Sequence, residues 1–306
     1  MGRLRIGLIG WGSVGAALGR MVAEGPLPVE LVAIGVRDPA RERPSAPPRG
    51  VDIGEAEDVL GRDLDAVVEL AGGVPQPLEW ARQTLRRGRP YVTANKALLA
   101  SHGGELAALA REHGAALLAS ASVGGGTPMI ETVEHLAPRG ITVLHGLLNA
   151  TSTFILSAMA EGRTYDEALR TAQELGHAEA DPSLDVEGRD AAQKLAILAS
   201  VAWDHWRPER EVDVQGIVGL PVAPGSTIRL VAEATRERMQ VRPMELPNDS
   251  PLARAGGVEG VLEIEAGATY RLSGPGAGGA VTAGAVYADL ARLVRGERPI
   301  LFAGKS

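Results

Sequence analysis

The sequence predicts an α/β protein with two domains, the first a doubly wound parallel sheet and the second a mixed sheet with helices. Apolar runs of strand length alternate with helical patterns from the N-terminus to about residue 120, and the order of elements changes near residue 130. The early runs are almost wholly apolar, which is typical of parallel strands covered by helices on both faces. A chain of 306 residues is long enough for two ordinary cores.

The expected first domain spans residues 1–130. Its predicted strands are 5–9, 29–36, 64–70, 91–93 and 115–119, and its predicted helices are 16–24, 77–87 and 101–113. Residues 39–50 are rich in proline and arginine and are predicted to form a loop.

The expected second domain spans residues 131–281. A helix is predicted at 128–136, at its entrance, and further helices at 152–161, 165–175 and 186–203. Strands are predicted at 141–148, 227–235, 238–246 and 258–272.

Composition excludes several classes of protein. The net charge is −7 with both signs interspersed, which argues against non-specific binding to nucleic acid. There is no cysteine, so disulfides, cysteine-ligated metals and a thiol nucleophile are excluded. No apolar run reaches the roughly 18 residues that a membrane span needs. The short basic start leads into a glycine-interrupted strand and not a signal peptide, so we expect a cytoplasmic protein without a membrane partner.

Three glycines follow the first predicted strand. Gly10, Gly12 and Gly15 have the G-x-G-x-x-G spacing, and they stand between a strand and a helix, with a second strand about 20 residues further on. This spacing permits a tight turn, the close approach of a pyrophosphate and close packing of helix on strand. The context favours a Rossmann-type dinucleotide site over three turn glycines without a ligand.

The end of the second predicted strand bears on cofactor choice. An acid there binds the ribose 2′-hydroxyl of NAD, whereas an arginine accepts the 2′-phosphate of NADP. The chain offers Arg37 followed by Asp38, with Arg41 and Arg43 adding positive charge downstream. We expect NADP to be preferred, with NAD or a merely solvated arginine loop as alternatives.

Lys96 follows the fourth predicted strand, in the segment Thr93-Ala94-Asn95-Lys96. Ligands of open α/β sheets bind beyond the carboxyl ends of the strands, so Lys96 is placed to face a nicotinamide and a substrate. The alternative is a surface lysine that begins a helix.

A further cluster of polar residues lies between 175 and 194. It has five acids in twelve residues, and Asp190 and Lys194 stand four apart on one face of a predicted helix. The pattern suits a pocket for a small molecule that carries an amine, with the acids holding the ammonium and the lysine exchanging a proton at an oxygen. The alternatives are a helix salt bridge beside a solvated acidic loop, or a metal site, which no histidine pair supports. We interpret His177 as structural.

These motifs resemble those of homoserine dehydrogenases along most of the chain. The resemblance lies in Gly10–Gly15, Ala94–Lys96, Val123–Pro128, Leu148–Leu156, Gly176–Lys194 and Gly274–Ala283. The segment Gly176–Lys194 is its most specific part. The resemblance implies reversible, NAD(P)-dependent reduction of L-aspartate 4-semialdehyde to L-homoserine, in the branch that leads to threonine and methionine.

The resemblance also implies roles for individual residues. Lys96 and Lys194 become candidates for proton transfer and for polarising the substrate oxygen, with Asp190 binding substrate and orienting Lys194. Glu179, Asp185 and Thr151 would bind substrate. The cofactor would be bound by Gly10, Gly12, Ser13, Val14, Gly15, Arg37, Asn95, Lys96 and Gly276. A sodium ion would be held by the backbone carbonyls of Ser120, Val123, Gly125 and Thr127. A C-terminal helix at about 282–306 would complete the cofactor domain, and the second domain would form a homodimer or larger homo-oligomer.

The chain departs from the family pattern at three positions near these sites. Ser120 stands where the family has a glutamate, which removes a charge near the sodium site, Ala150 replaces a glycine, and Thr153 replaces a frequent asparagine. The last two crowd a turn beside the substrate. They keep open a related reductase of another small amino-acid aldehyde, and a catalytically silent nucleotide sensor is the third alternative. We also expect no C-terminal regulatory domain within 306 residues.

Overall fold

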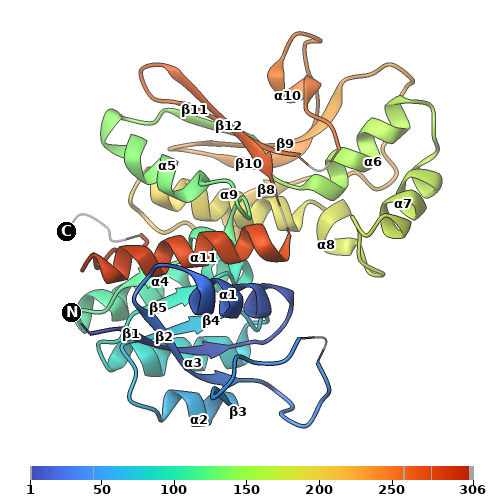
Figure 1. Cartoon of the computed structure of the whole chain (residues 1–306). Helices are drawn as coiled ribbons and strands as arrows, with labels where there is room; N and C mark the ends of the chain where they lie inside the picture. The colour runs from blue at the N-terminus through green and yellow to red at the C-terminus, as the bar shows by residue number, and fades with distance from the viewer. Residues whose placement is uncertain (1, 44, 258, 277, 303–306) are drawn as a thin grey trace. The chain divides into compact units, whose positions relative to one another are not determined.

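The computed structural model describes residues 2–43, 45–257, 259–276 and 278–302 (Figure 1). It divides into two compact units. The first unit comprises residues 1–128, 204–206 and 277–306, and the second comprises residues 129–203 and 207–276. Each unit contains one six-stranded sheet.

The first unit contains a parallel sheet with the strand order β3-β2-β1-β4-β5-β6, so the predicted doubly wound fold is confirmed. Its strands are β1 (Leu4–Ile9), β2 (Val29–Gly35), β3 (Asp52–Gly54), β4 (Ala66–Glu69), β5 (Tyr91–Thr93) and β6 (Leu117–Leu118). Its helices are α1 (Ser13–Glu24), α2 (Ala56–Leu60), α3 (Pro75–Arg86), α4 (Lys96–Glu112), the 3₁₀ turn η1 (Ser120–Ser122) and α11 (Gly279–Val294). Apolar side chains of β1, β2, α1 and α11 form its main core.

The last helix differs from its predicted range of about 282–306. It begins three residues earlier and ends at Val294, because Gly296 has a φ of +81° and Pro299 follows, neither of which continues a helix. The chain then runs beside β6, where Ile300 forms a parallel bridge with Leu117. Ile300 thus lies beside the edge strand of the sheet, and the predicted residues 303–306 lie outside the described part of the chain.

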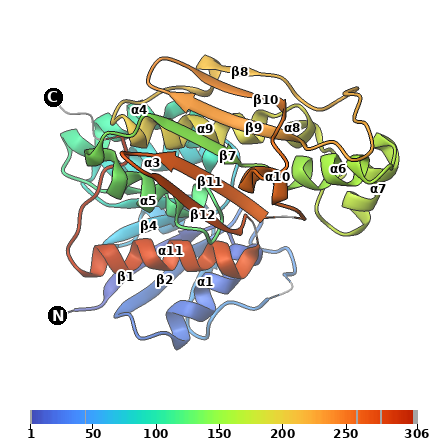
Figure 2. The same cartoon turned by 90° about the horizontal axis from the view of Figure 1, so that it is seen from above.

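The second unit contains a mixed sheet with the order β12-β11-β7-β9-β10-β8 (Figure 2). Its strands are β7 (Val143–Leu147), β8 (Val212–Val214), β9 (Ile228–Thr235), β10 (Met239–Glu245), β11 (Glu259–Glu265) and β12 (Thr269–Pro275). Neighbouring strands are antiparallel except β10 and β8. Its helices are α5 (Met129–Leu136), η2 (Ala137–Arg139), α6 (Ala150–Ala160), α7 (Tyr165–Glu174), α8 (Ser183–Val186), α9 (Arg189–Ala202), η3 (Glu209–Glu211) and α10 (Pro251–Arg254).

One prediction for the second sheet was wrong. Residues 258–272 were expected to form a single strand, but 259–265 and 269–275 form the antiparallel hairpin of β11 and β12. Gly267, with a φ of +73°, provides the turn, and the N–H of Ala266 donates to the carbonyl of Ala268. A lone glycine in an otherwise strand-like pattern is a weak signal for a turn.

Candidate active site

The turn between β1 and α1 has the geometry that the glycine motif predicts. Gly10 has a φ of +106°, and a Cβ on Gly15 would lie 2.3 Å from the carbonyl oxygen of Gly10. By contrast, apart from Gly12 and its two neighbours in the chain, no atom of the described residues lies within 4 Å of the place where a Cβ on Gly12 would stand. Packing of the chain itself therefore requires Gly10 and Gly15, whereas Gly12 leaves a side of the turn open to a phosphate.

A cleft of about 790 Å³ opens beside this turn, within the first unit. Such a volume is typical of cofactor sites. Its lining includes Gly10, Trp11, Gly12, Arg37, Asp38, Arg41, Arg43, Ala71, Gly72, Gln76 and Trp80. Of the predicted cofactor residues, Gly10, Gly12 and Arg37 line this cleft. Ser13 and Val14 lie in the first turn of α1 beside it, and Gly15 is buried beneath.

The arginine-rich loop after β2 is held by one of its own arginines. The guanidinium of Arg43 donates to the carbonyls of Asp38, Pro39 and Arg41. Asp38 accepts from the N–H of Ala40 at 3.0 Å. Arg37 and Arg41 are exposed at the cleft, and within the described part of the chain their side chains have no hydrogen bond or ion pair. These two side chains are therefore available to a ligand.

A buried carboxylate joins the loops after β4 and β5. Glu69 is fully buried and accepts from the N–H groups of Ala71 (2.7 Å) and Gly72 (2.9 Å) and from the hydroxyl of Thr93 (2.7 Å). The Thr93 hydroxyl in turn accepts from the N–H of Asn95 at 2.9 Å. Glu69 therefore connects the Ala71–Gly72 segment, which lines the cleft, to the turn that precedes Lys96. Burial raises the pKa of Tyr91 well above 10, and the neighbouring carboxylate raises it further.

Asn95 fixes the start of the helix that Lys96 begins. Its side-chain oxygen accepts from the N–H of Leu98 at 3.1 Å, which caps α4, and its amide donates to the carbonyl of Gly73 at 2.6 Å. Lys96 is half-buried at the first position of α4. Neither residue lines the described cleft, so their predicted contact with cofactor stays a prediction.

The segment that follows β6 is buried. Ser120, Val123, Gly125 and Thr127 are all buried, and Gly124 and Gly125 have positive φ. Ser120 donates to the carboxylate of Asp289 on α11, through its N–H at 3.0 Å and its hydroxyl at 2.6 Å. A carboxylate therefore lies at Ser120, although the residue itself carries no charge.

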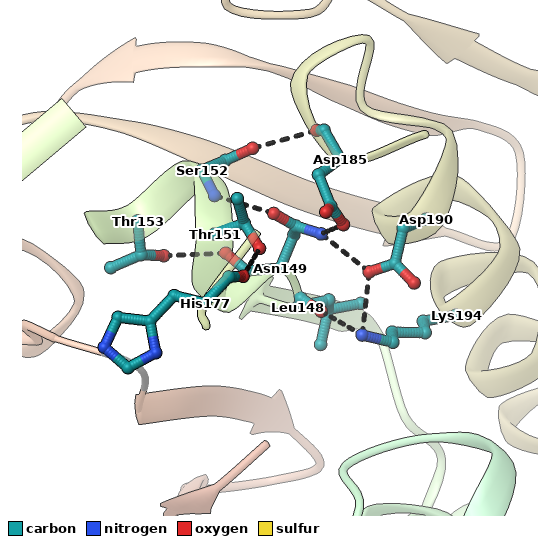
Figure 3. A network of polar contacts seen from close by, with 9 residues as sticks. All are labelled: Leu148, Asn149, Thr151, Ser152, Thr153, His177, Asp185, Asp190 and Lys194. Carbon is teal, nitrogen blue, oxygen red and sulfur yellow. Dashed lines mark hydrogen bonds and ion pairs between the residues drawn. The ribbon is translucent and has the colours of Figure 1, made fainter. Parts of the chain in front are cut away.

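In the second unit, three of the predicted residues, Asp185, Asp190 and Lys194, form one polar network with their neighbours (Figure 3). Asn149, which follows β7, is its centre. The Asn149 amide donates to Asp185 at 2.6 Å and to Asp190 at 2.8 Å, and its oxygen accepts from the N–H of Ser152 at 2.7 Å, which caps α6. Lys194 donates to Asp190 and to the carbonyl of Leu148, both at 2.8 Å.

A sharp corner between α8 and α9 brings the two aspartates together. Gly188 has a φ of +82°, so the chain reverses between Asp185 on α8 and Asp190 in the first turn of α9. Desolvation raises the pKa of Asp185, and the negative charge of Asp190 adds to this, while Asn149 and Lys194 act in the opposite sense. The network therefore holds two carboxylates and one ammonium in a largely buried place.

The remaining predicted residues lie around this network or outside it. Thr151 is buried and donates to the carbonyl of His177 at 2.6 Å. Glu179 is exposed, and none of the hydrogen bonds in Figure 3 involves it. Gly276 follows β12 in the second unit. The hydroxyl of Thr153 donates to the carbonyl of Asn149 at 3.0 Å, so this departure from the family pattern is absorbed as a bond within α6.

Sequence reasoning missed three residues that organise these places. Asn149, Glu69 and Asp289 are each at most 4% exposed and each makes at least two hydrogen bonds. A polar residue at the end of an apolar strand could have pointed to Glu69 and Asn149. Asp289 had no such signal, because its partner is 169 positions away.

The parallel sheet, the glycine turn and the open cleft define the class as an NAD(P)-dependent oxidoreductase, and the comparisons with known proteins agree. Residues 10–120 match the model of the homoserine dehydrogenase NAD-binding domain, and residues 128–291 match that of homoserine dehydrogenase. The chain belongs to the homoserine dehydrogenase family. No helix in the described ranges combines the length and apolarity that a membrane crossing requires.

Individual relatives agree with this assignment. Homoserine dehydrogenase of Bacillus subtilis is 35% identical, over 97% of this chain and 74% of the relative. The crystal structure of a homoserine dehydrogenase from Thiobacillus denitrificans has a TM-score of 0.87 and 31% identity, covering 96% of this chain and 73% of that one. A hyperthermophilic archaeal homoserine dehydrogenase in complex with NADPH has a TM-score of 0.84 and 28% identity, covering 97% and 99%.

Proposed function

We propose that this chain catalyses the reversible NAD(P)-dependent oxidation of L-homoserine to L-aspartate 4-semialdehyde, the step that leads towards threonine and methionine, in the cytoplasm. The observation that carries the proposal is the network of Asp185, Asn149, Asp190 and Lys194 in a chain of this family. Two carboxylates and one ammonium leave a net negative charge, which suits a substrate that brings an ammonium group.

The two parts of the chain divide the work in this proposal. Residues 1–130 with the C-terminal helix bind the cofactor, and residues 131–281 bind the substrate. Asp185 and Asp190, with Glu179 at the edge, hold the substrate ammonium, and Thr151 lines the site. The glycine turn (Gly10, Gly12, Ser13, Val14, Gly15) holds the pyrophosphate, with Asn95, Lys96 and Gly276 near the nicotinamide.

Proton transfer falls to the lysines. A bound nicotinamide supplies or accepts the hydride. Lys194, oriented by Asp190, donates a proton to the oxygen of the semialdehyde as its negative charge develops, and Lys96 helps to polarise that oxygen. In the oxidative direction the amine must be neutral to accept the proton, so homoserine oxidation becomes faster as pH rises. A flat rate between neutral and alkaline pH would count against a lysine in this role.

We propose NADP as the preferred cofactor and NAD as the alternative. Arg37 and Arg41 face the cleft without a partner in the described ranges, which supports binding of a 2′-phosphate. The initial rate with L-homoserine, measured separately with NADP and NAD at alkaline pH, tests both proposals. Turnover supports the reaction, and the ratio of rates reports the preference. Cofactor binding without turnover would favour a related reductase for another amino-acid aldehyde.

We further propose a sodium ion at the carbonyls of Ser120, Val123, Gly125 and Thr127. The hydroxyl of Thr127 is buried and has no hydrogen-bond partner among the residues that the structure describes, which supports binding of an ion at this segment. The Asp289 carboxylate supplies negative charge at Ser120. A higher melting temperature in sodium chloride than in choline chloride at equal ionic strength is expected, and equal values would contradict it.

Finally, we propose that the second unit forms a homodimer. Register pairs place His145, Glu233 and Glu263 side by side on one face of its sheet, and His145 contacts Glu233 at 3.0 Å. The helices α6 and α9 pack against the same sheet, and the alternation of buried residues puts them on its other face. The short helix α10 covers one end of the His145 face, where Leu252 clusters with Leu147, Val231 and Val261. The charged remainder of that face supports pairing with a second copy. Light scattering should give twice the chain mass, whereas a monomer would contradict the proposal.

A further inference from the structure

Trp11, between the first two glycines of the turn, makes a contact that the glycine motif does not require. Its indole N–H donates to the backbone carbonyl of Ser45 at 2.8 Å. Ser45 belongs to the arginine-rich loop after β2, so this bond joins the nucleotide turn to a loop 34 positions further along the chain. Trp11 is only 8% exposed and also lines the cleft.

The indole is held firmly on its other side. A Cβ on Gly19 would lie 2.4 Å from the Trp11 ring, so the ring packs directly on α1 where only glycine leaves room. Glycine in a helix interior costs stability, and here it accommodates the indole. Trp11 thus packs on α1 and at the same time holds the arginine-rich loop through its hydrogen bond to Ser45.

The loop that Trp11 holds carries the cations of the cleft. The guanidinium of Arg43 donates to three backbone carbonyls of the loop itself. Arg37 and Arg41 face the cleft. Arg43 fixes the first turn of the loop, and Trp11 attaches the following part, at Ser45, to the nucleotide turn. A loop anchored in this way pays less ordering entropy when its arginines bind an anion.

We infer that Trp11 is a positioning residue for cofactor selectivity, because its indole N–H holds the arginine loop in the conformation that receives the 2′-phosphate. This inference rests on the proposed NADP preference. A ligand without the 2′-phosphate does not use the arginines, so loss of the indole bond affects it little.

The test compares the affinity of two probes, adenosine 2′,5′-bisphosphate and 5′-AMP, by isothermal titration calorimetry. Trp11→Phe keeps an aromatic ring over Gly19 and removes the N–H. It should weaken binding of the bisphosphate about threefold to tenfold, the range for one net hydrogen bond, and change binding of 5′-AMP less than about twofold. The ratio of the two affinities cancels any general damage to the cleft.

Two control variants make the result specific. Trp80 also lines the cleft and donates to Glu57 at 3.1 Å, outside the arginine loop, so Trp80→Phe should leave the ratio unchanged. Ser45→Ala keeps the carbonyl that accepts from Trp11 and should also leave it unchanged. Trp11→Met, which lacks the donor but has similar reach, replaces Trp11→Phe if the latter does not fold.

The outcomes separate this inference from the proposed cofactor preference. If the unaltered protein binds the bisphosphate more tightly and Arg41→Ala reduces that preference, while the Trp11 variants do not, only the role of Trp11 is overturned. If the unaltered protein does not distinguish the two probes, both the NADP preference and the role of Trp11 fail. The inference is supported if the ratio of bisphosphate affinity to 5′-AMP affinity falls in the Trp11 variants and stays unchanged in Trp80→Phe and Ser45→Ala.

Discussion

Asn95 and Asn149 occupy equivalent places in the two units and differ in what they organise. Each follows a strand, and each caps the next helix through its side-chain oxygen. The amide of Asn95 donates to a backbone carbonyl, that of Gly73. The amide of Asn149 donates to two carboxylates, those of Asp185 and Asp190.

The difference lies in the charged groups that each network brings together. Around Asn95, the buried Glu69 carboxylate is matched by three donors of the chain itself, two backbone N–H groups and a hydroxyl. Around Asn149, two carboxylates face one ammonium: the Asn149 amide donates to Asp185 and Asp190, Lys194 donates to Asp190, and Asp185 has a raised pKa. The satisfied network around Asn95 stabilises loops. The network around Asn149, which is unbalanced in charge, can bind a charged ligand.

The largest expected effect comes from removing the ammonium of the unbalanced network. Lys194→Ala should lower kcat by about 10²- to 10⁴-fold, the range for loss of a general acid–base group. NADPH affinity should stay unchanged, because Lys194 is not among the residues proposed to bind the cofactor. Steady-state kinetics with calorimetry of NADPH binding measures both. Lys96→Ala is the matched variant in the first unit and should raise the KM for cofactor as well. Near-normal turnover of Lys194→Ala would refute the assignment.

A matched pair of substitutions compares the two asparagines directly. Asn149→Asp and Asn95→Asp both keep a good helix cap. In Asn149→Asp the amide that donates to Asp185 and Asp190 becomes a third carboxylate. It repels both aspartates from the places where they hold the substrate ammonium, so the KM for homoserine should rise at least about tenfold. Asn95→Asp loses one bond to a backbone carbonyl and should change the KM for cofactor about twofold to fivefold. Equal effects at both positions would remove the distinction between the two networks.

Much of the first unit could be predicted from the sequence, because its signals are local. The strand-glycine-helix pattern at 5–24 and the short strand Tyr91–Thr93 depend on neighbours in the chain. The three-residue β3 and the five-residue α2 were missed, since such short elements contain too few residues to show a period.

The sites were harder to predict, because they depend on contacts between distant positions. The i, i+4 spacing was enough to predict the bond between Asp190 and Lys194. The position of Asp185 beside Asn149 required the positive φ of Gly188, and the Ser120–Asp289 pair required the packing of α11 within the first unit. Local pattern carries no information on either.

A third substitution tests the satisfied network. Thr93→Val removes the hydroxyl that joins Glu69 to the N–H of Asn95 and leaves both groups buried without that partner. The expected loss is about 1–3 kcal/mol of stability, or roughly 2–12 °C in melting temperature for a chain of this size. Thr93→Ser keeps the hydroxyl and should stay within about 1–2 °C of the unaltered protein under the same estimate. If both variants melt alike, the hydroxyl does not stabilise these loops.

The smallest expected effect should have the opposite sign and lie in the unbalanced network. A raised carboxyl pKa means that the folded chain holds this proton more tightly than the unfolded chain, so ionised Asp185 costs stability at neutral pH. Asp185→Asn keeps an oxygen for the Asn149 amide and removes that charge. It should raise the melting temperature by about 1–3 °C near pH 7. The gain should shrink as pH falls through the folded pKa and vanish below the unfolded value of about 3.9.

The same substitution should weaken homoserine binding, because the site then lacks one of the two charges proposed to hold the substrate ammonium. Asp213→Asn is the matched control: Asp213 is an exposed aspartate of the same unit and pairs with Arg242 on the surface. Its removal should neither stabilise the protein nor change the KM for homoserine, since exposed ion pairs contribute little. If Asp185→Asn lowers the melting temperature at neutral pH, the charge at Asp185 is balanced within the folded chain. The contrast with the network around Asn95 would then disappear.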